Sequence, residues 1–450
     1  MKEETIAAIA TAPGQGGIGI VRISGPETEK ILRDIFKPAC KSNTDKLESH
    51  RMMYGWVSDG EENLDECMAV IMRAPKSYTR EDVAEIQSHG GTQVLQKILA
   101  VILKRGARMA DPGEFTRRAF MNGRIDLSQA EAVMQLIAAR GEQERRAAVK
   151  QMAGGTAAFV REASDELYQL QAGLAACIDY PEEITDEEGS GMLRSGLEKL
   201  TKTLRNAVDE RSSQLIHDGL QVTLFGIPNA GKSSLLNALI GQEKAIVTEI
   251  PGTTRDIVEG EIMLDGIRVH LTDTAGLRET TDPIERIGVE RSEKARQNAD
   301  IAMLILDGSK ELTDEEHVWI RKLNDDDVII INKSDLPQIT AEEKVRKIRP
   351  GIRCMTVSAL DCESIKPIRE ILRKSAEIGD HLTLIQPRHL DAVKRAIGHL
   401  EDAIRTLERW TPDMAATDLQ AAQNALGEIT GDRVDEKLLD AVFSTFCVGK

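Results

Sequence analysis

The first part of the chain mixes short apolar runs with loops. Over about residues 1–120, segments such as GGIGIVRISG, MMYGWVSDG and CMAVIMRAP precede the longer stretch GGTQVLQKILAVILKRG. Short runs of this kind are typical of strands, whereas apolar spacings of three and four are typical of an amphipathic helix. We therefore predict an α+β domain at the amino-terminal end.

A helical pattern follows, and it returns near the end of the chain. Apolar residues first recur at spacings of three and four at Leu167, Leu170, Leu174 and Ile178. The second set with this rhythm is Leu390, Val393, Ile397, Leu400, Ile404 and Leu407. Such spacing places one apolar stripe on each helix, which must be buried. We expect one helical domain whose halves are residues 121–216 and 379–450.

Between these halves, over residues 217–378, apolar runs alternate with helix-like segments. The runs GLQVTLFG, IRVHLTDTAG, ADIAMLILDG, DVIIINKSD and IRCMTVSAL each end in a polar or glycine-rich loop. This pattern predicts parallel strands with ligand-binding loops at their carboxyl ends. The simplest architecture is an α/β domain inserted into the helical domain, since the ends of such a domain lie close together.

The composition indicates the cellular compartment and limits how the chain can contact membranes and RNA. The 450 residues are 41% hydrophobic and 29% charged, as in a soluble globular protein. No apolar run reaches the roughly 20 residues of a membrane span, and the start lacks a signal-peptide core. Six cysteines without a CxxC pair favour a reducing cytoplasm. Because the net charge is −16, contact with RNA requires a local basic patch or a basic partner.

The segment GIPNAGKSS, residues 226–234, matches G-x-x-x-x-G-K-[ST] between a predicted strand and a predicted helix. Backbone N–H groups of such a loop surround phosphate oxygens, the lysine reaches the β- and γ-phosphates, and the next hydroxyl binds Mg²⁺. The predicted nucleotide contacts here are Asn229, Ala230, Gly231, Lys232, Ser233 and Ser234.

Three later loops follow in the order expected of a guanine-nucleotide domain. DTAG brings Asp273 to the metal and the Gly276 N–H to the γ-phosphate. NKSD supplies Asp335, whose carboxylate accepts two hydrogen bonds that guanine offers and adenine does not, and SAL can donate a backbone N–H to the guanine oxygen. The predicted contacts are Asp273, Thr274, Ala275, Gly276, Asn332, Lys333, Asp335, Ser358 and Ala359. Together these loops predict a GTPase.

The residues for hydrolysis are less well defined by the pattern. PGTTRD supplies Thr254 to complete the Mg²⁺ coordination when the γ-phosphate is present. Leu277 stands where Ras-like proteins place the glutamine that orients the attacking water. The following stretch offers Arg278 and three acids, and the choice among the acids stays open: Glu279, Asp282 and Glu285. Asn229 could hold a monovalent cation beside the phosphates or simply form a turn.

These segments together resemble the MnmE (TrmE) family of tRNA-modifying GTPases over essentially the whole length. The resemblance rests on PGQGGIGIVRISG, SYTREDVAEIQSHGG, PGEFTRRAFMNGRIDLSQAEAV, DYPEE, IPGTTRD, DTAGLRE and the terminal CVGK. It implies a tetrahydrofolate-binding, dimerising domain at 1–120, a helical domain at 121–216 and 379–450, and an inserted Ras-like P-loop GTPase domain at 217–378. Arg80 stands where the family usually has glycine, and Ser88 where cysteine is common.

The resemblance also implies an activity. With an MnmG-type partner that uses FAD and NADH, such proteins add an aminomethyl or carboxymethylaminomethyl group to C5 of the wobble uridine of certain tRNAs. The carbon would come from a 5,10-methylene or 5-formyl tetrahydrofolate. The implied cofactors are therefore GTP, Mg²⁺, K⁺ and this folate. The implied assembly is a homodimer that joins the partner in a heterotetramer or larger complex.

Residue roles follow from the same resemblance. Glu285 matches the position of the water-orienting glutamate, with Arg278 beside it to stabilise the switch. The resemblance also implies that GTP contacts the loop of residues 248–254, which are Thr248, Glu249, Ile250, Pro251, Gly252, Thr253 and Thr254. The implied metal ligands are Ser233 and Thr254 for Mg²⁺, and Asn229, Thr248, Ile250 and Thr253 for K⁺.

The folate positions implied by the resemblance are Arg22, Glu81, Arg124 and Lys450. A carboxylate can pair with the pterin amine and ring N–H, and guanidinium groups suit carboxylates. From its residue type alone, Cys447 could pack as a small hydrophobe. The resemblance instead makes it the candidate thiol that faces the one-carbon unit.

Two other functions are compatible with part of this pattern. An RNA-binding GTPase of ribosome assembly would share the P-loop, but it would carry a KH-like or basic RNA domain, and no such module is visible beside a net charge of −16. A folate aminomethyltransferase with an incidental nucleotide site would not need the full set of guanine loops. Both rivals are therefore disfavoured.

Overall fold

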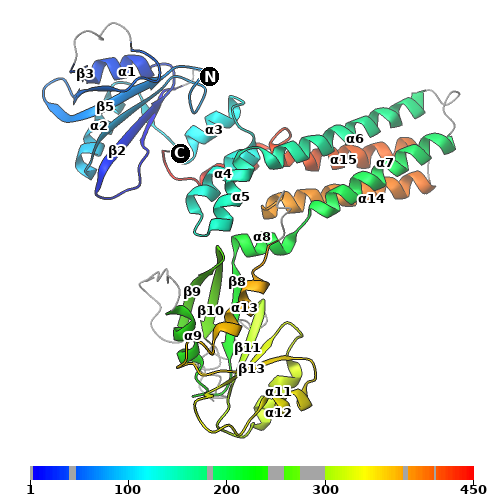
Figure 1. The fold of residues 1–450 in the computed structure, drawn as a ribbon. Helices are drawn as coiled ribbons and strands as arrows, with labels where there is room; N and C mark the ends of the chain where they lie inside the picture. Colours follow the sequence, from blue (N-terminus) through cyan, green and yellow to red (C-terminus); the bar gives the residue numbers. More distant parts are fainter. Residues whose placement is uncertain are drawn as a thin grey trace, which may run out of the picture. The chain divides into compact units, whose positions relative to one another are not determined.

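The computed structural model of the chain describes residues 4–39, 47–179, 186–241, 258–273, 299–378, 384–409 and 412–449 (Figure 1). The chain forms two compact units. The first comprises Met1–Ile137, Lys150–Arg205 and Ala392–Lys450, and the second comprises Ala138–Val149 and Asn206–Asp391. Among the described residues, no helix is both long and apolar enough to cross a membrane.

The first unit contains a seven-stranded sheet of order β3-β4-β5-β6-β2-β1-β7. The strands are β1 (Ile6–Ile9), β2 (Gly16–Ser24), β3 (Phe36–Pro38), β4 (Met53–Ser58), β5 (Asn63–Met72), β6 (Val83–Gly90) and β7 (Arg108–Met109). Among the strand pairs that the structure describes in this sheet, β1–β7 is parallel and the others are antiparallel. Helices α1 (Thr28–Ile35) and α2 (Thr92–Lys104) bury Ile31 and Ile98 against the core face of the sheet. The predicted α+β fold is confirmed.

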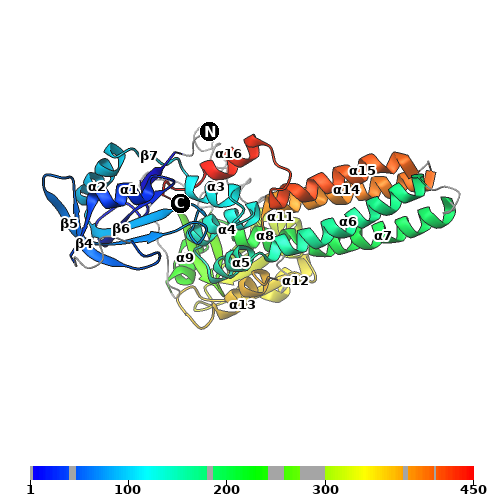
Figure 2. The same cartoon turned by 90° about the horizontal axis from the view of Figure 1, so that it is seen from above.

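Long helices from two distant parts of the sequence lie side by side in this unit. The helices that belong wholly or mostly to it are α3 (Glu114–Met121), α4 (Leu127–Ala138), α6 (Gly155–Asp179), α7 (Asp186–Ala207), α14 (Pro387–Arg409), α15 (Pro412–Thr430) and α16 (Glu436–Ser444), whereas most of α5 (Glu142–Met152) belongs to the second unit. Figure 2 shows α6 and α7 beside α14 and α15. Leu167, Leu174 and Leu400 are buried as expected, but Ile178 is exposed because α6 ends one residue later.

The second unit is built on a six-stranded sheet of order β13-β12-β11-β8-β10-β9. The strands are β8 (Leu220–Phe225), β9 (Val258–Leu264), β10 (Ile267–Asp273), β11 (Ile301–Asp307), β12 (Val328–Asn332) and β13 (Arg353–Thr356). All neighbours pair in parallel except β9 and β10. This is the predicted doubly wound α/β fold, with its strand ends gathered at one edge.

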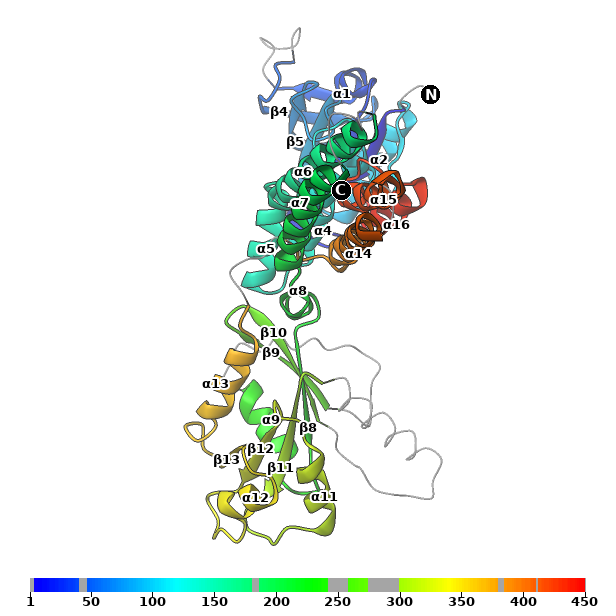
Figure 3. The ribbon, with the colours of Figure 1, turned by 90° about the vertical axis from the view of Figure 1, so that its right-hand side faces the viewer.

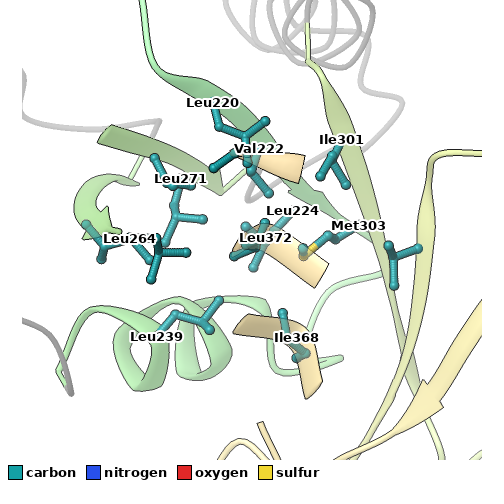
Figure 4. Packing of buried hydrophobic residues seen from close by; sticks show 14 of the residues in the cluster. Leu220, Val222, Leu224, Leu239, Leu264, Leu271, Ile301, Met303, Ile368 and Leu372 are labelled. Atoms are coloured by element: carbon teal, nitrogen blue, oxygen red, sulfur yellow. The ribbon is translucent and has the colours of Figure 1, made fainter. Parts of the chain in front are cut away.

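Helices cover both faces of this sheet, as a parallel sheet requires. They are α8 (Glu210–His217), α9 (Lys232–Ile240), α11 (Asp314–Lys322), α12 (Glu342–Ile348) and α13 (Lys366–Ser375). Side chains alternate between the two faces along each strand. Val222 and Leu224 pack against α9 and α13 (Figure 4). Leu304 packs with residues of α11 and α12 on the other face. Figure 3 shows these helices around the sheet.

Candidate functional site

The P-loop joins β8 to α9 and depends on glycine at two positions. Gly226 has φ 148° and Gly231 has φ 97°, a region that favours glycine. A Cβ atom at Gly226 would collide with the carbonyl oxygen of Ile305, and one at Gly231 would collide with the side chain of Asn332. Asn229 also has a positive φ of 65°. The loop backbone therefore curls as a phosphate-binding loop does, directly before the amino terminus of α9.

Lys232 is buried at the start of α9 and points back into the loop. Its ammonium donates hydrogen bonds to the carbonyl oxygens of Gly226 at 2.9 Å and Ile227 at 3.0 Å. Burial lowers the pKa of Lys232, and the nearby Asp273 carboxylate partly opposes this change. A phosphate anion in the loop would supply the negative charge that this buried cation lacks.

Ser233 and Asp273 form the candidate magnesium site. The Ser233 hydroxyl donates to Oδ2 of Asp273 at 2.6 Å. Asp273 ends β10 and is fully buried, and its Oδ1 finds no hydrogen-bond donor within the part of the chain described above. A buried carboxylate oxygen without a donor costs free energy unless a cation or water meets it. This pair of oxygen ligands fits Mg²⁺, which prefers carboxylates and hydroxyls.

Asn332 fastens the two loops that are predicted to recognise guanine to the P-loop. Its Nδ2 donates to the carbonyl oxygen of Ala230 at 2.9 Å, and its Oδ1 accepts from the Ala359 N–H at 3.0 Å. In the same region the Ser358 hydroxyl donates to Oδ1 of Asp335 at 2.6 Å. The predicted residues of three separate loops therefore come together at the carboxyl end of the sheet.

Asp307 is a member of this site that sequence reasoning missed. It ends β11 directly opposite Asn332 of β12, and its Oδ2 accepts from the Lys333 ammonium at 2.6 Å. Burial disfavours the charge of Asp307, but hydrogen bonds from Lys333 and Ser309 outweigh that effect and lower its pKa to about 2. The sequence contains one indication of this residue. The apolar run ADIAMLILDG ends in an aspartate, and the end of this strand lies at the same sheet edge as the other loops.

Several predicted residues lie outside the described ranges. They are Thr248, Glu249, Ile250, Pro251, Gly252, Thr253, Thr254, Thr274, Ala275, Gly276, Arg278, Glu279, Asp282, Glu285 and Lys450. Their roles stay predictions.

In the first unit, two of the implied folate residues meet on one aromatic ring. The guanidinium of Arg22 lies 5.5 Å from the centroid of Tyr78 and 5.6 Å from that of Phe115. The guanidinium of Arg124 lies 4.7 Å from the Tyr78 centroid and donates to the Tyr78 carbonyl oxygen at 3.2 Å. Cations over aromatic faces are attracted by the ring quadrupole. Tyr78, which the sequence did not single out, thus orients both arginines.

Glu81, the implied folate carboxylate, is already engaged in a buried network. Both of its oxygens accept from Nη1 of Arg118 at 3.1 Å, and Oε2 accepts from Ser24 at 2.6 Å. Arg118 also donates to Glu114, which Arg108 contacts at 2.6 Å. Burial alone would raise the pKa of Glu114, but these arginines hold it below its usual value. Sequence reasoning missed this network because its members are dispersed along the chain.

Arg80 has a φ of 60°, the left-handed conformation that favours the glycine usual at this place in the family. The departure in sequence therefore leaves the backbone turn in place. The arginine side chain adds a hydrogen bond to the carbonyl oxygen of Asn122 at 2.9 Å.

The carboxyl-terminal segment follows α16, whose first turn is capped by Asp435 accepting from the Leu438 N–H at 2.8 Å. Phe443 and Phe446 are buried, so the chain is anchored almost to its end. Cys447 is exposed, and its carbonyl oxygen accepts from the Gly113 N–H at 3.4 Å. The interpretation of Cys447 as a packed hydrophobe is therefore wrong, and its reactivity stays a prediction.

Known proteins match the chain along its whole length. A relative named tRNA modification GTPase MnmE from Heliobacterium modesticaldum is 41% identical, with 100% of both chains covered. One of the same name from Bacillus subtilis is 41% identical over 99% of this chain and 100% of its own. Among solved structures, Era from Aquifex aeolicus bound to GDP and AlF4⁻ is 26% identical over 40% of this chain and 65% of its own, with a TM-score of 0.29.

Two family descriptions match consecutive parts of the chain. Residues 5–124 match the GTP-binding protein TrmE N-terminus, and residues 127–447 match the MnmE helical domain. The resemblance drawn from the sequence motifs is thereby confirmed. The chain belongs to the MnmE family of tRNA modification GTPases.

Proposed function

We propose that this protein hydrolyses GTP to drive modification of the wobble uridine at C5 in certain tRNAs. The observation that carries the proposal is the full-length match to relatives named tRNA modification GTPase. The convergence of Lys232, Asp273 and Asn332 at one sheet edge supports the GTPase part. The product would carry an aminomethyl or carboxymethylaminomethyl group.

In the nucleotide-binding part of the mechanism, hydrogen bonds within the chain already orient Lys232 and Asp335. Lys232 would exchange the carbonyl oxygens of Gly226 and Ile227 for phosphate oxygens, since its ammonium is buried beside the loop. Asp335, held by the Ser358 hydroxyl, would accept the two guanine N–H bonds. Mg²⁺, when bound, neutralises phosphate charge, and Ser233, Asp273 and Thr254 would hold it.

Hydrolysis would depend on a second cation and a positioned water. Asn229 would offer its side-chain carbonyl to K⁺, together with backbone carbonyls of Thr248, Ile250 and Thr253. Such a cation stabilises charge that develops on the phosphates, as an arginine finger does in other GTPases. Glu285 would orient the attacking water, with Arg278 stabilising the segment around it.

The folate half would lie in the first unit. Arg22, Arg124 and Lys450 would contact the tetrahydrofolate derivative, and Glu81, which accepts hydrogen bonds from Arg118, would pair with the pterin. Cys447 would face the 5,10-methylene or 5-formyl carbon. We place the reaction in the cytoplasm, in a homodimer joined by an MnmG-type protein that supplies FAD and NADH chemistry. GTP would bias this assembly through its different affinity for two conformations.

Reconstitution tests the proposal directly. The purified chain is mixed with the MnmG-type protein of the same organism, unmodified tRNA, GTP, Mg²⁺, K⁺, FAD and NADH. A 5,10-methylene tetrahydrofolate supplies the carbon, ammonium or glycine is added in separate reactions as the nitrogen donor, and tRNA nucleosides are then separated by mass. We expect the C5-modified uridine with GTP and K⁺, and its loss with GDP. The Bacillus subtilis pair serves as the positive control. Hydrolysis of GTP without modified uridine, in a mixture where the control pair is active, would refute the tRNA role.

A further inference from the structure

The last residues of the chain are held at two points, although most chain ends fray. The Gly113 N–H donates to the carbonyl oxygen of Cys447 at 3.4 Å. Two residues further on, Nη1 of Arg22 donates to the carbonyl oxygen of Gly449 at 3.3 Å. The backbone of Cys447 and Gly449 is thus tied to the N-terminal domain, while the Cys447 side chain stays exposed.

Several contacts fix the orientation of the Arg22 side chain, which donates the hydrogen bond to Gly449. It faces Glu85 across the β2–β6 pair, and its Nε and Nη2 lie 2.9 Å and 2.8 Å from Oε1 of that carboxylate. Both side chains are only 16% exposed. The rings of Tyr78 and Phe115 contact the guanidinium. Because the guanidinium is planar, fixing Nε and Nη2 also fixes the direction of Nη1.

The backbone conformation of Gly449 permits this hydrogen bond. Its φ is 96°, which favours glycine, and a Cβ atom there would collide with the carbonyl oxygen of Ile9 and lie 3.0 Å from Cα of Ala10. The glycine therefore does more than let the chain leave α16, because it allows the terminal backbone to lie directly against β1. A larger residue would lift the segment away from Arg22.

We propose that Arg22, oriented by Glu85, is a positioning residue that latches residues 445–449 against the N-terminal domain. Together with the Gly113 N–H, the latch holds the backbone at Cys447 and at Gly449, so that the exposed thiol has a defined place instead of a freely moving one. This role is additional to any ligand contact of Arg22. Only its consequence for the modification reaction rests on the proposed function.

Spin labelling of Cys447 tests the latch. The parent for the experiment carries Cys40→Ser, Cys177→Ser and Cys362→Ser, so that Cys447 is labelled selectively. Burial raises the pKa of Cys67 and of Cys354 to about 12, which keeps these thiols unreactive near neutral pH. The rotational correlation time of the nitroxide on the full chain is then measured by electron paramagnetic resonance.

Three variants weaken the latch from both sides. Arg22→Lys removes the planar fork, Glu85→Gln removes the charge that orients it, and Gly449→Ala displaces the chain end. Each is expected to raise the ratio of released to held chain end by about tenfold, the scale of losing one charge-assisted hydrogen bond, and thereby to increase the mobile component of the spectrum. The matched control is Arg105→Lys, which alters an exposed ion pair with Asp34 in the same domain. This control should leave the spectrum unchanged.

The outcomes separate the latch from the proposed function. Unchanged label mobility in both Arg22→Lys and Glu85→Gln would overturn the latch, with circular dichroism verifying that at least one of them is folded. Unlabelled variants with an otherwise native cysteine set are also assayed for tRNA modification. Full modification by a variant with a mobile chain end would overturn the positioning role. An inactive unsubstituted chain would count against the proposed function, while the label mobility of the spin-labelled proteins would still report on the latch.

Discussion

At the scale of single residues, both candidate sites depend on side chains that join distant segments of the chain. Asn332 links the P-loop to the loop that contains Ala359, and Arg22 contacts Gly449, a separation of 427 residues. The phosphate and guanine loops could be predicted because each motif is local and carries its own chemistry. The Arg118–Glu81 and Lys333–Asp307 pairs could not, since no periodicity or spacing specifies which charged residues the fold brings together.

Replacing Asn229 by glycine tests the cation assignment at this scale. Glycine retains the left-handed backbone, φ 65° in the parent, and removes only the side-chain carbonyl. We expect GTP hydrolysis to lose its stimulation by K⁺ over Na⁺, a fall of about tenfold or more, because charge on the phosphates is no longer offset. Initial rates in each salt measure this, and unchanged GDP affinity is the control. Equal K⁺ stimulation in parent and variant would exclude Asn229 as a ligand.

Asp307→Asn tests the ion pair with Lys333 through its pH dependence. The pKa of Asp307 is lowered to about 2 in the folded protein, below its usual value, so its ionised form favours the folded state. Its contribution, on the order of 2 kcal/mol, is complete above the unfolded-state pKa near 4 and disappears as the pH falls through about 2. The parent should therefore exceed the variant in stability at pH 6, by less at pH 3.5.

Calorimetry checks this expectation on the full chain. The melting transition of the nucleotide-binding domain is identified as the one that GDP raises, since a ligand stabilises the state that binds it. The difference in melting temperature between parent and variant is then compared at the two pH values. A difference that is the same at both would show that Asp307 stabilises by packing and not by its charge.

At the scale of elements, hydrophobic alternation and helical spacing specified most strands and helices. The buried positions of α6 and α14 follow the predicted stripe, but the stripe did not reveal where α6 ends, which leaves Ile178 exposed. The grouping of Ala138–Val149 with the nucleotide-binding unit also escaped prediction. It rests on contacts such as the ion pair between Glu144 of α5 and Arg268 of β10, at 2.7 Å.

Glu144→Ala tests the contribution of α5 to this unit. Glu144 and Arg268 are 12% and 16% exposed, so removing the carboxylate leaves a largely buried guanidinium without its counter-ion. We expect the free energy of unfolding of this unit to fall by about 3 kcal/mol. The matched control is Arg145→Ala on the same helix, which breaks an exposed pair with Glu142 and should cost less than about 1 kcal/mol. Equal effects in a urea titration followed by nucleotide release would contradict this account.

At the scale of the whole molecule, one chain contains a nucleotide-binding unit and a unit that carries the implied folate residues and the chain end. The fold class and the family were readable from sequence because the P-loop, the guanine loops and the terminal CVGK occur together in one chain. The arrangement of charged partners within each unit required the structure. The central claim is that GTP hydrolysis by this chain serves modification of tRNA.

The most direct test of that claim is a nucleoside profile of tRNA from cells. Total tRNA is digested from cells that lack this protein, and the wobble uridines are quantified by mass spectrometry. We expect loss of the C5 aminomethyl-type groups, restoration by the parent chain and by Arg105→Lys, and no restoration by Lys232→Ala, which removes the ammonium proposed to bind phosphate. Unchanged C5 modification in the cells that lack the protein would contradict the account.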